Sequence, residues 1–325
     1  MNLPRRQFLH LAASAAALPA LPRIARAQNY PMRPVHLIVG YAAGGGTDIV
    51  ARLIGQWLSE RLGRPFIVEN RPGGNSNIAT EGVVRAPPDG YTLFLMDSAP
   101  ALNATLYDKL TFNFIHDIAP VAGIAGQPVV MVINPSLNAK TVSEFITYVN
   151  ANPGKVNMAS GGIGNITHLS GELFKMMAGV NMVHVPYRGG GAALTDLLGG
   201  QVQVLFTGLL SAIEYIRVGR LRALAVTSAT RSNALPDIPS LREFLPGYET
   251  NDWKGIGAPK DTPVEIIAKL NEGINGALAD PKMRGRLADL GGTPLPGSSA
   301  DFGKFIAKET EKWGKVIRAA NIKPE

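Results

Sequence analysis

Two runs of three glycines carry the strongest chemical signal in this sequence. Each run follows a β-branched apolar stretch and precedes a stretch with helical spacing; together they comprise Gly44, Gly45, Gly46, Gly189, Gly190 and Gly191. Glycine lets the backbone approach a ligand closely, and free N–H groups at the start of the following helix attract anions. The two loops in matching contexts therefore predict an anion-binding site, with two tight turns that bind nothing as the alternative.

Side chains beside these glycine-rich loops could add to such a site. Arg188, next to Tyr187 at a predicted strand end, could pair with a carboxylate or be a solvated arginine. Asp48 lies in the first turn of a predicted helix, where plain stabilisation of the helix N-terminus is the simpler interpretation. His168 begins another predicted helix after a glycine-rich loop and could line a cleft.

The sequence contains no complete motif for nucleotide binding or for a serine nucleophile. The dinucleotide fingerprint G-x-G-x-x-G lacks its third glycine when started from Gly44, Gly162 or Gly189, and no P-loop is present. The serine nucleophile motif G-x-S-x-G is also broken at every candidate. The histidines are not paired at metal-binding spacing, and the absence of cysteine excludes thiolate metal sites and disulfides. We therefore predict no cofactor, no metal and no catalytic residue.

The first residues predict an export signal. Arg5 and Arg6 precede an apolar stretch that ends at a small-x-small pattern, which predicts twin-arginine export with cleavage near Ala27. An amphipathic helix is the alternative, but Pro19 and Pro22 would break it. Without residues 1–27 the net charge falls from +7 to about +3, which gives no support to nucleic-acid binding. We expect a soluble periplasmic protein.

The elements that must position these residues alternate between strand and helix. With 325 residues, the chain is long enough for two domains. Alternation predicts an α/β fold with mostly parallel sheets flanked by helices. Capping boxes are expected at Thr141 and Thr262, the second with Pro263 at the first helical position. The predicted strands cover residues 35–39, 65–69, 91–96, 128–133, 156–159, 181–185, 202–206 and 221–226, and the clearest helices cover 47–62, 166–178 and 299–320.

Seven sequence stretches resemble a known family over nearly the whole mature chain. They are GGTDIVAR (45–52), VENRPG (68–73), PDGYTL (88–93), THLSGELF (167–174), HVPYRG (184–189), AALTDLLGGQV (192–202) and RALAVTS (222–228). With these motifs in this order, the chain resembles the receptors of tripartite tricarboxylate transporters, also called Bug-type solute-binding proteins. The resemblance implies a two-lobed periplasmic binding protein fold, type II-like, with two crossovers. The implied lobes are residues 28–125 plus 230–325, and residues 126–229.

The resemblance also implies a function and a site. Family ligands are small carboxylates, including dicarboxylates, tricarboxylates, amino acids and aromatic acids, and the receptor delivers them to a membrane permease without catalysis. The implied ligand-binding set is Tyr41, Gly44, Gly45, Gly46, Thr47, Asp48, Asn75, Ser76, Asn77, Ser98, Ser160, Gly161, Gly164, His168, Tyr187, Arg188, Gly189, Gly190, Thr207 and Asp252. An exported subunit that reports to a membrane kinase would use the same pocket, and a cleft enzyme acting on a carboxylate is a further alternative.

The chain departs from the family pattern at the expected pocket. Ala42 and Ala43 stand where prolines are usual, and Asp97 replaces what is often a small or hydroxyl residue. A carboxylate at this position could accept a hydrogen bond from a ligand hydroxyl or amine, or repel a second ligand carboxylate.

Overall fold

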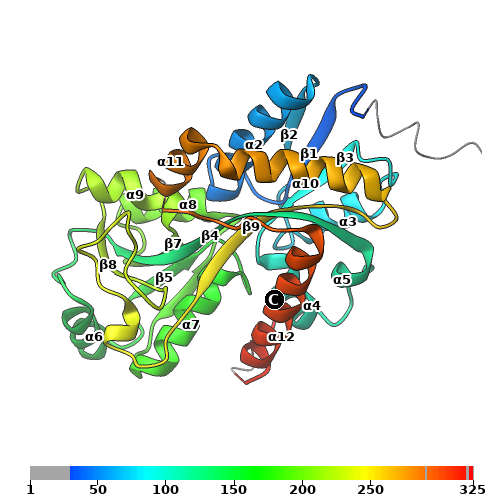
Figure 1. Cartoon of the computed structure of the whole chain (residues 1–325). Helices are drawn as coiled ribbons and strands as arrows, with labels where there is room; N and C mark the ends of the chain where they lie inside the picture. Colours follow the sequence, from blue (N-terminus) through cyan, green and yellow to red (C-terminus); the bar gives the residue numbers. More distant parts are fainter. Residues whose placement is uncertain (1–29, 290, 320–321, 325) are drawn as a thin grey trace, which may run out of the picture.

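One long mixed sheet organises the molecule (Figure 1). The computed structural model describes residues 30–289, 291–319 and 322–324, so the predicted export signal lies outside the described residues. The strand order is β2-β1-β3-β9-β4-β7-β5-β6, with β8 and β10 pairing with β4. Helices flank the sheet, and the predicted α/β class is confirmed.

The elements follow the predicted alternation closely. The first part contains β1 (Val35–Val39), α2 (Gly46–Leu62), β2 (Phe66–Asn70), α3 (Asn77–Val84), β3 (Thr92–Met96), α4 (Ala99–Leu106) and α5 (Phe114–Asp117). The middle part contains β4 (Ile118–Ile133), α6 (Val142–Ala151), β5 (Asn157–Ser160), α7 (Ile166–Ala178), β6 (Val183–Pro186), α8 (Gly190–Leu198), β7 (Val204–Gly208), α9 (Leu209–Arg217) and β8 (Arg222–Val226). The last part contains the short helix η2 (Leu241–Glu243), β9 (Asn251–Pro259), α10 (Val264–Ala279), α11 (Pro281–Asp289), β10 (Thr293–Pro294) and α12 (Ser299–Ala319).

Strand β4 joins the two halves of the sheet. It is 16 residues long, far longer than the strand predicted over residues 128–133. Its first part pairs antiparallel with β9 as far as Pro128, and its last part, from Val129, pairs with β7. A single continuous strand therefore passes through both halves, so the two halves share a backbone connection at the centre of the molecule.

Parallel strands on both sides of this centre direct loops to the same cleft. β1 pairs in parallel with β2 and β3, and β5 pairs in parallel with β6 and β7. The loops that follow β1, β5, β6 and β7 lead into α2, α7, α8 and α9. Ligands of open α/β sheets bind outside the carboxyl ends of such strands. The fold therefore brings four helix N-termini toward one region.

Buried apolar side chains form a core for each half. Leu37 and Ile54 belong to a core between the first sheet half and helices α2 and α10, whereas Phe145 and Phe206 belong to one around the second sheet half. No helix among the described residues is long and apolar enough to cross a membrane.

The two predicted capping boxes have different outcomes. Thr141 is the N-cap of α6 and accepts a hydrogen bond from the Glu144 N–H, which is one half of the predicted box. The other half does not form, because the Glu144 carboxylate accepts from the Lys140 N–H instead of the Thr141 N–H. The prediction at Thr262 is wrong, because Pro263 is the N-cap of α10 and the Thr262 hydroxyl donates to the Pro259 carbonyl at 2.7 Å. The hydroxyl thus closes the preceding turn instead of capping the helix.

Candidate functional site

Two neighbouring cavities lie between the halves of the molecule. The smaller has a volume of about 60 Å³ and the larger about 330 Å³, and Tyr41 and Gly161 line both. The two halves touch beside the smaller cavity, where the Gly46 N–H donates to Ser211 Oγ at 3.0 Å. Gly189 has a φ of +123°, and a side chain there would lie 3.9 Å from the Ala42 nitrogen in the other half. The distance is an ordinary van der Waals contact, so the positive φ alone explains the glycine.

Three helices that reach the smaller cavity begin at a glycine N-cap. The N-caps of α2, α8 and α9 are Gly45, Gly189 and Gly208, and none of the three has a side-chain cap within the described residues. Gly46, Gly190 and Gly208 line the cavity. The first-turn N–H groups of a helix have no acceptor within the helix, and the aligned peptide dipoles add positive potential there. This end of the cavity can therefore bind an anion by backbone N–H groups contributed from both halves.

Asp48 stabilises the first glycine loop from outside the cavities. Its carboxylate accepts from the Gly44 N–H at 3.0 Å and from Asn70 Nδ2 at 3.0 Å. It also forms a two-point ion pair with Arg52, at 2.9 and 3.0 Å. Burial alone would raise the pKa of Asp48, but the Arg52 and Gly44 hydrogen bonds hold that pKa below its ordinary value. Asp48 thus fixes the loop as an anion and does not line either cavity.

The loop before α7 is built differently. Asn165 Oδ1 caps the helix by accepting from the N–H groups of Thr167 and His168, at 3.1 and 3.0 Å. The Gly161 N–H donates to Thr167 Oγ1 at 2.9 Å, and the Gly164 N–H donates to His168 Nδ1 at 3.0 Å. The backbone donors of this loop are therefore occupied by the protein itself. Asn165 and Thr167 line the cavity, whereas His168 lies buried behind the loop.

Two stacked histidines support that loop. The rings of His168 and His184 lie 3.8 Å apart at 12°, and Ser160 Oγ lies 2.7 Å from His184 Nε2. Burial, and then the neighbouring His168, lower the pKa of His184 to about 3. His184 is consequently neutral at ordinary pH, which allows its Nε2 to accept the serine hydrogen bond.

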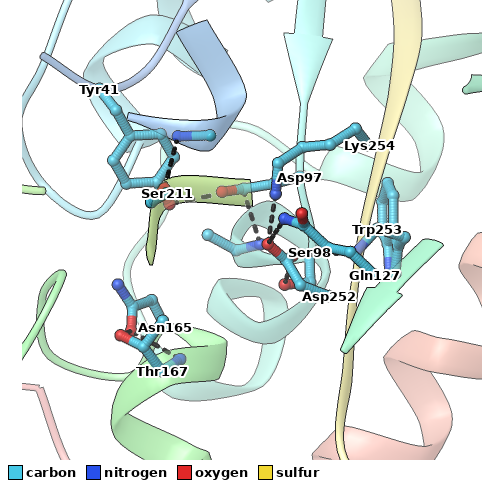
Figure 2. A network of polar contacts seen from close by, with 12 residues as sticks. Tyr41, Asp97, Ser98, Gln127, Asn165, Thr167, Ser211, Asp252, Trp253 and Lys254 are labelled. Atoms are coloured by element: carbon cyan, nitrogen blue, oxygen red, sulfur yellow. Dashed lines mark hydrogen bonds and ion pairs between the residues drawn. The ribbon is translucent and has the colours of Figure 1, made fainter. Parts of the chain in front are cut away.

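The other end of the smaller cavity holds a buried polar cluster (Figure 2). Asp252 forms an ion pair with Lys254 and accepts from Ser98 Oγ at 2.9 Å and Gln127 Nε2 at 3.3 Å. Asp97 accepts from the Ala99 N–H at 3.0 Å and from the Tyr41 hydroxyl at 3.4 Å. The cluster contains two carboxylates and one ammonium group, so it opposes the positive helix ends across the cavity.

Burial dominates the titration of this cluster. Burial and the nearby Asp252 raise the pKa of Asp97 to about 6, although Lys254 acts in the opposite direction. Burial, and next the charge of Asp97, raise the pKa of Tyr41 well above its ordinary value, so Tyr41 keeps its proton and can donate. At neutral pH Asp97 is mainly ionised, and near pH 6 it is half protonated.

The larger cavity is lined by side chains from both halves. Asn75 and Ser76 belong to the loop before α3, and Tyr187 and Arg188 follow β6. The Tyr187 hydroxyl donates to Asp196 of α8 at 2.6 Å, so α8 holds this hydroxyl in place. Asn75 Oδ1 lies 3.4 Å from the Tyr41 hydroxyl, which links this wall to the smaller cavity.

The predicted site residues divide into lining and supporting sets. Those that line the smaller cavity are Tyr41, Gly45, Gly46, Thr47, Gly161, Gly190, Thr207 and Asp252. Those that line the larger one are Tyr41, Asn75, Ser76, Gly161, Tyr187 and Arg188. The remaining ones lie in the same loops or directly behind them, and they are Gly44, Asp48, Asn77, Ser98, Ser160, Gly164, His168 and Gly189.

The lining side chains that the sequence did not predict include Tyr107, Gln127, Ser211 and Lys254. A signal was available for Lys254, because residues two apart on a strand face the same side and Asp252 was already expected in the wall. Gln127 and Ser211 gave no comparable signal, since each reaches the cavity only through long-range packing. Asp97 was singled out as a departure and does line the cavity.

Comparison with known proteins adds the family. A family model described as the tripartite tricarboxylate transporter family receptor matches residues 50–322. The protein BugT of Bordetella pertussis is 36% identical over 300 residues, which cover 91% of this chain and 92% of BugT.

Two solved structures from Rhodopseudomonas palustris are similar along their whole length. One, solved with adipate, has 35% sequence identity and a TM-score of 0.89, covering 91% of this chain and 100% of the other. MatC, solved with bound malate, has 32% identity and a TM-score of 0.83, covering 89% and 100%. These likenesses confirm the predicted periplasmic binding protein fold. The chain therefore belongs to the receptor family of the tripartite tricarboxylate transporters.

Proposed function

We propose that this protein is a periplasmic receptor that captures a small carboxylate between its two lobes and delivers it to a membrane permease. The observation that carries the proposal is the convergence of three helix N-termini without side-chain caps, those of α2, α8 and α9, on one cavity. A carboxylate there would accept backbone N–H bonds from both halves. Such charge-assisted bonds are roughly twice as strong as neutral ones.

The relatives support a carboxylate ligand. One similar structure was solved with adipate and another with malate, both carboxylates. The family's description as transporter receptors supports the permease as partner. The pair of arginines and the cleavage pattern near Ala27 support export to the periplasm.

The lobes move, in this proposal, about the central strands. The proposed lobes are residues 28–125 plus 230–325, and residues 126–229. The change of β4 partner after Pro128 supports the first crossover. Leu241 and Tyr248 lie within the stretch 230–325 assigned to the first lobe, yet they pack in the core of the second sheet half. This packing favours moving the return crossover from residue 230 to just before β9. Closure would then bring Gly46 of one lobe against Ser211 of the other, around the ligand.

A ligand screen tests the binding function. Residues 28–325 are screened by thermal shift against mono-, di-, tricarboxylates and aromatic acids, and the hits are measured by calorimetry. A ligand at 100 times its Kd adds about 2.7 kcal/mol of stability, which raises the melting temperature visibly. Binding of any member supports the proposal. No response from any carboxylate, after removal of co-purified ligand by unfolding and refolding, would contradict it.

Ser211→Ala tests closure. The substitution removes the acceptor of the cross-lobe bond from the Gly46 N–H, whose net contribution should be about 1 kcal/mol. We expect roughly fivefold weaker affinity for the hit carboxylate in calorimetry. Ser143→Ala, at an exposed position on α6, is the matched control and should bind like the wild type.

A further inference from the structure

The far end of the smaller cavity contains hydrogen-bond acceptors that no donor among the described residues satisfies. Asp97 is only 7% exposed, and both its contacts, from the Ala99 N–H and the Tyr41 hydroxyl, go to Oδ1. Within the part of the chain that the structure describes, no donor lies within hydrogen-bond distance of Oδ2. Asp97 lines the cavity, so this second oxygen is available to a ligand.

Gln127 contributes another such acceptor. Its Nε2 donates to Asp252 Oδ2 at 3.3 Å, and because an ionised carboxylate only accepts, this contact fixes the orientation of the amide. Oε1 is then an acceptor, and it is buried without a partner among residues 30–289, 291–319 and 322–324. Gln127 is 2% exposed and lines the same cavity. Buried polar groups are nearly always hydrogen-bonded, so a missing partner calls for an explanation.

The charges of the cluster do not cancel. Asp252 is neutralised by its ion pair with Lys254, and both its oxygens are occupied, Oδ1 by Ser98 and the Trp253 N–H and Oδ2 by Lys254 and Gln127. Asp97 has no ion-pair partner among the described residues, so one negative charge faces the cavity. A buried charge is costly unless something pairs with it.

We propose that the solute of this receptor carries a protonated amine besides its carboxylate, and that Asp97 Oδ2 and Gln127 Oε1 receive that amine. This inference rests on the proposed function, because the carboxylate must occupy the helix N-termini for the amine to reach the opposite end. The cavity is then dipolar along one axis, with N–H donors at one end and acceptors at the other. The cavity has a volume of about 60 Å³, so the proposed ligand is a small zwitterion, an amino acid in the broad sense.

The alternatives fit this end less well. A dicarboxylate would place its second carboxylate against ionised Asp97, with Lys254 already engaged by Asp252. A hydroxy acid has a single donor for two free acceptors and leaves the charge of Asp97 unpaired. An ammonium group has three donors and the opposite charge.

Matched ligand series test the proposal in the wild-type protein. Each series keeps one carbon skeleton and changes one group, as in 4-aminobutyrate, 4-hydroxybutyrate and succinate; β-alanine, 3-hydroxypropionate and malonate; and alanine and lactate. Calorimetry should show the amine member binding at least tenfold more tightly than its dicarboxylate and hydroxyl counterparts in at least one series. Equal or tighter binding of the dicarboxylate would overturn the inference and leave the proposed function standing. If no carboxylate of any kind binds, the proposed function itself fails.

Asp97→Asn removes the charge and keeps the shape. The variant should lose at least tenfold in affinity for the amine ligand and should bind the dicarboxylate no worse than the wild type does. Asp237→Asn, at an exposed position, is the matched control and should change neither affinity. An Asp97→Asn protein that keeps the full amine preference would overturn the assignment. Circular dichroism and the melting temperature of both variants establish that they are folded.

The pH dependence of the preference gives an independent measurement. The groups facing Asp97 are Tyr41, Asp252 and Lys254, and Asp97 titrates with a pKa of about 6. Protonation of Asp97 below that pH should therefore reduce the preference for the amine over the dicarboxylate, in the wild type but not in Asp97→Asn. A preference that stays constant between about pH 8 and pH 5 would argue against Asp97 as the partner.

Discussion

The loops before α2 and α7 look alike in the sequence and differ in the structure. Both follow a strand, both are glycine-rich, and both reach the smaller cavity. The helix after the first begins at a glycine N-cap without a side-chain cap, whereas Asn165 caps the helix after the second. The Gly44 and Gly46 N–H groups of the first loop donate to Asp48 and Ser211, so the donors that remain for a ligand are those later in the first turn of α2. The second loop satisfies its N–H groups internally.

The difference shows what makes a glycine loop a binding site. Glycine alone permits close approach, but the available donors decide whether an anion gains anything by approaching. The side chains that hold the two loops differ accordingly. Asp48 accepts from the N–H of Gly44, which lies four residues before it and outside the cavity. In the second loop, Thr167 and His168 accept from the Gly161 and Gly164 N–H groups. Three predictions test this comparison.

The largest effect is expected from giving α2 a side-chain cap. Gly45 has an extended backbone, with φ −81° and ψ 165°, and a Cβ there would lie 3.8 Å from the Ala42 carbonyl, so Asp fits. Its carboxylate would accept from the first-turn N–H groups and occupy the place of the ligand carboxylate. We expect Gly45→Asp to weaken ligand binding about 100-fold, or ~2.8 kcal/mol, in calorimetry.

The control for this variant is Gly45→Ala, which adds a side chain without a charge or an acceptor. It should lose no more than a few-fold in affinity. The free Gly45→Asp protein should be as stable as the wild type or more stable by about 0.3 kcal/mol, because Asp is only slightly better than Gly at an N-cap. Wild-type affinity in Gly45→Asp would show that the anion does not bind at α2.

A smaller effect, on stability, is expected at the capped loop. Asn165→Ala removes the acceptor of the Thr167 and His168 N–H groups, which should lower the free energy of unfolding by about 1 kcal/mol. Denaturant unfolding measures the loss, and Asn165→Ser, which can cap again, should recover most of it. Affinity should fall by less than tenfold, far less than in Gly45→Asp. If Asn165→Ala weakens binding more than Gly45→Asp does, the proposed difference between the two loops is wrong.

The smallest effect is expected on the stability of the protein at acidic pH. Because His184 has a folded pKa of about 3 against an ordinary 6.5, the unfolded state binds the proton first. Stability is then complete above about pH 6.5 and is lost as the pH falls toward 3. His184→Asn should reduce the drop in melting temperature between pH 7 and pH 5 by about 2 °C.

The titration of Glu172 does not contribute to the drop in melting temperature between pH 7 and pH 5. Burial would raise the pKa of Glu172, but His168 and Lys175 hold that pKa at about 2, so its contribution is lost only below its ordinary 4.5. An exposed histidine outside this stack, such as His116, is the matched control, and His116→Asn should leave the pH dependence unchanged. An unchanged drop in His184→Asn would mean that the stacked pair does not support the loop.

The local residue pattern was enough to predict most of the helices and strands. β1 occupies residues 35–39 and α7 occupies residues 166–178, as predicted, because a short β-branched run and a helical apolar period each have one obvious solution. α4 and β9 were missed. β9, at the centre of the sheet, reads Asp-Trp-Lys-Gly-Ile-Gly, and its buried charged residues hide the apolar alternation that marks a strand.

Local pattern was also enough to locate the loops that line the cavities. It could not distinguish Tyr41 and Gly161, which line both cavities, from Ser160 and His168, which lie behind them. Neighbours in sequence point in different directions once a loop turns, and direction depends on contacts from other parts of the chain.

The sequence by itself determined the α/β class, the family and the presence of two glycine loops suited to an anion, because periodicity, turn residues and motifs are local properties. Only the tertiary structure decided that the first glycine loop meets the opposite half, where the Gly46 N–H donates to Ser211 Oγ, because these two residues are far apart in the sequence. It also decided the chemistry of the far end. Asp97 follows β3, Gln127 lies on β4, and Asp252 and Lys254 lie on β9, so folding alone buries these polar groups together, away from water.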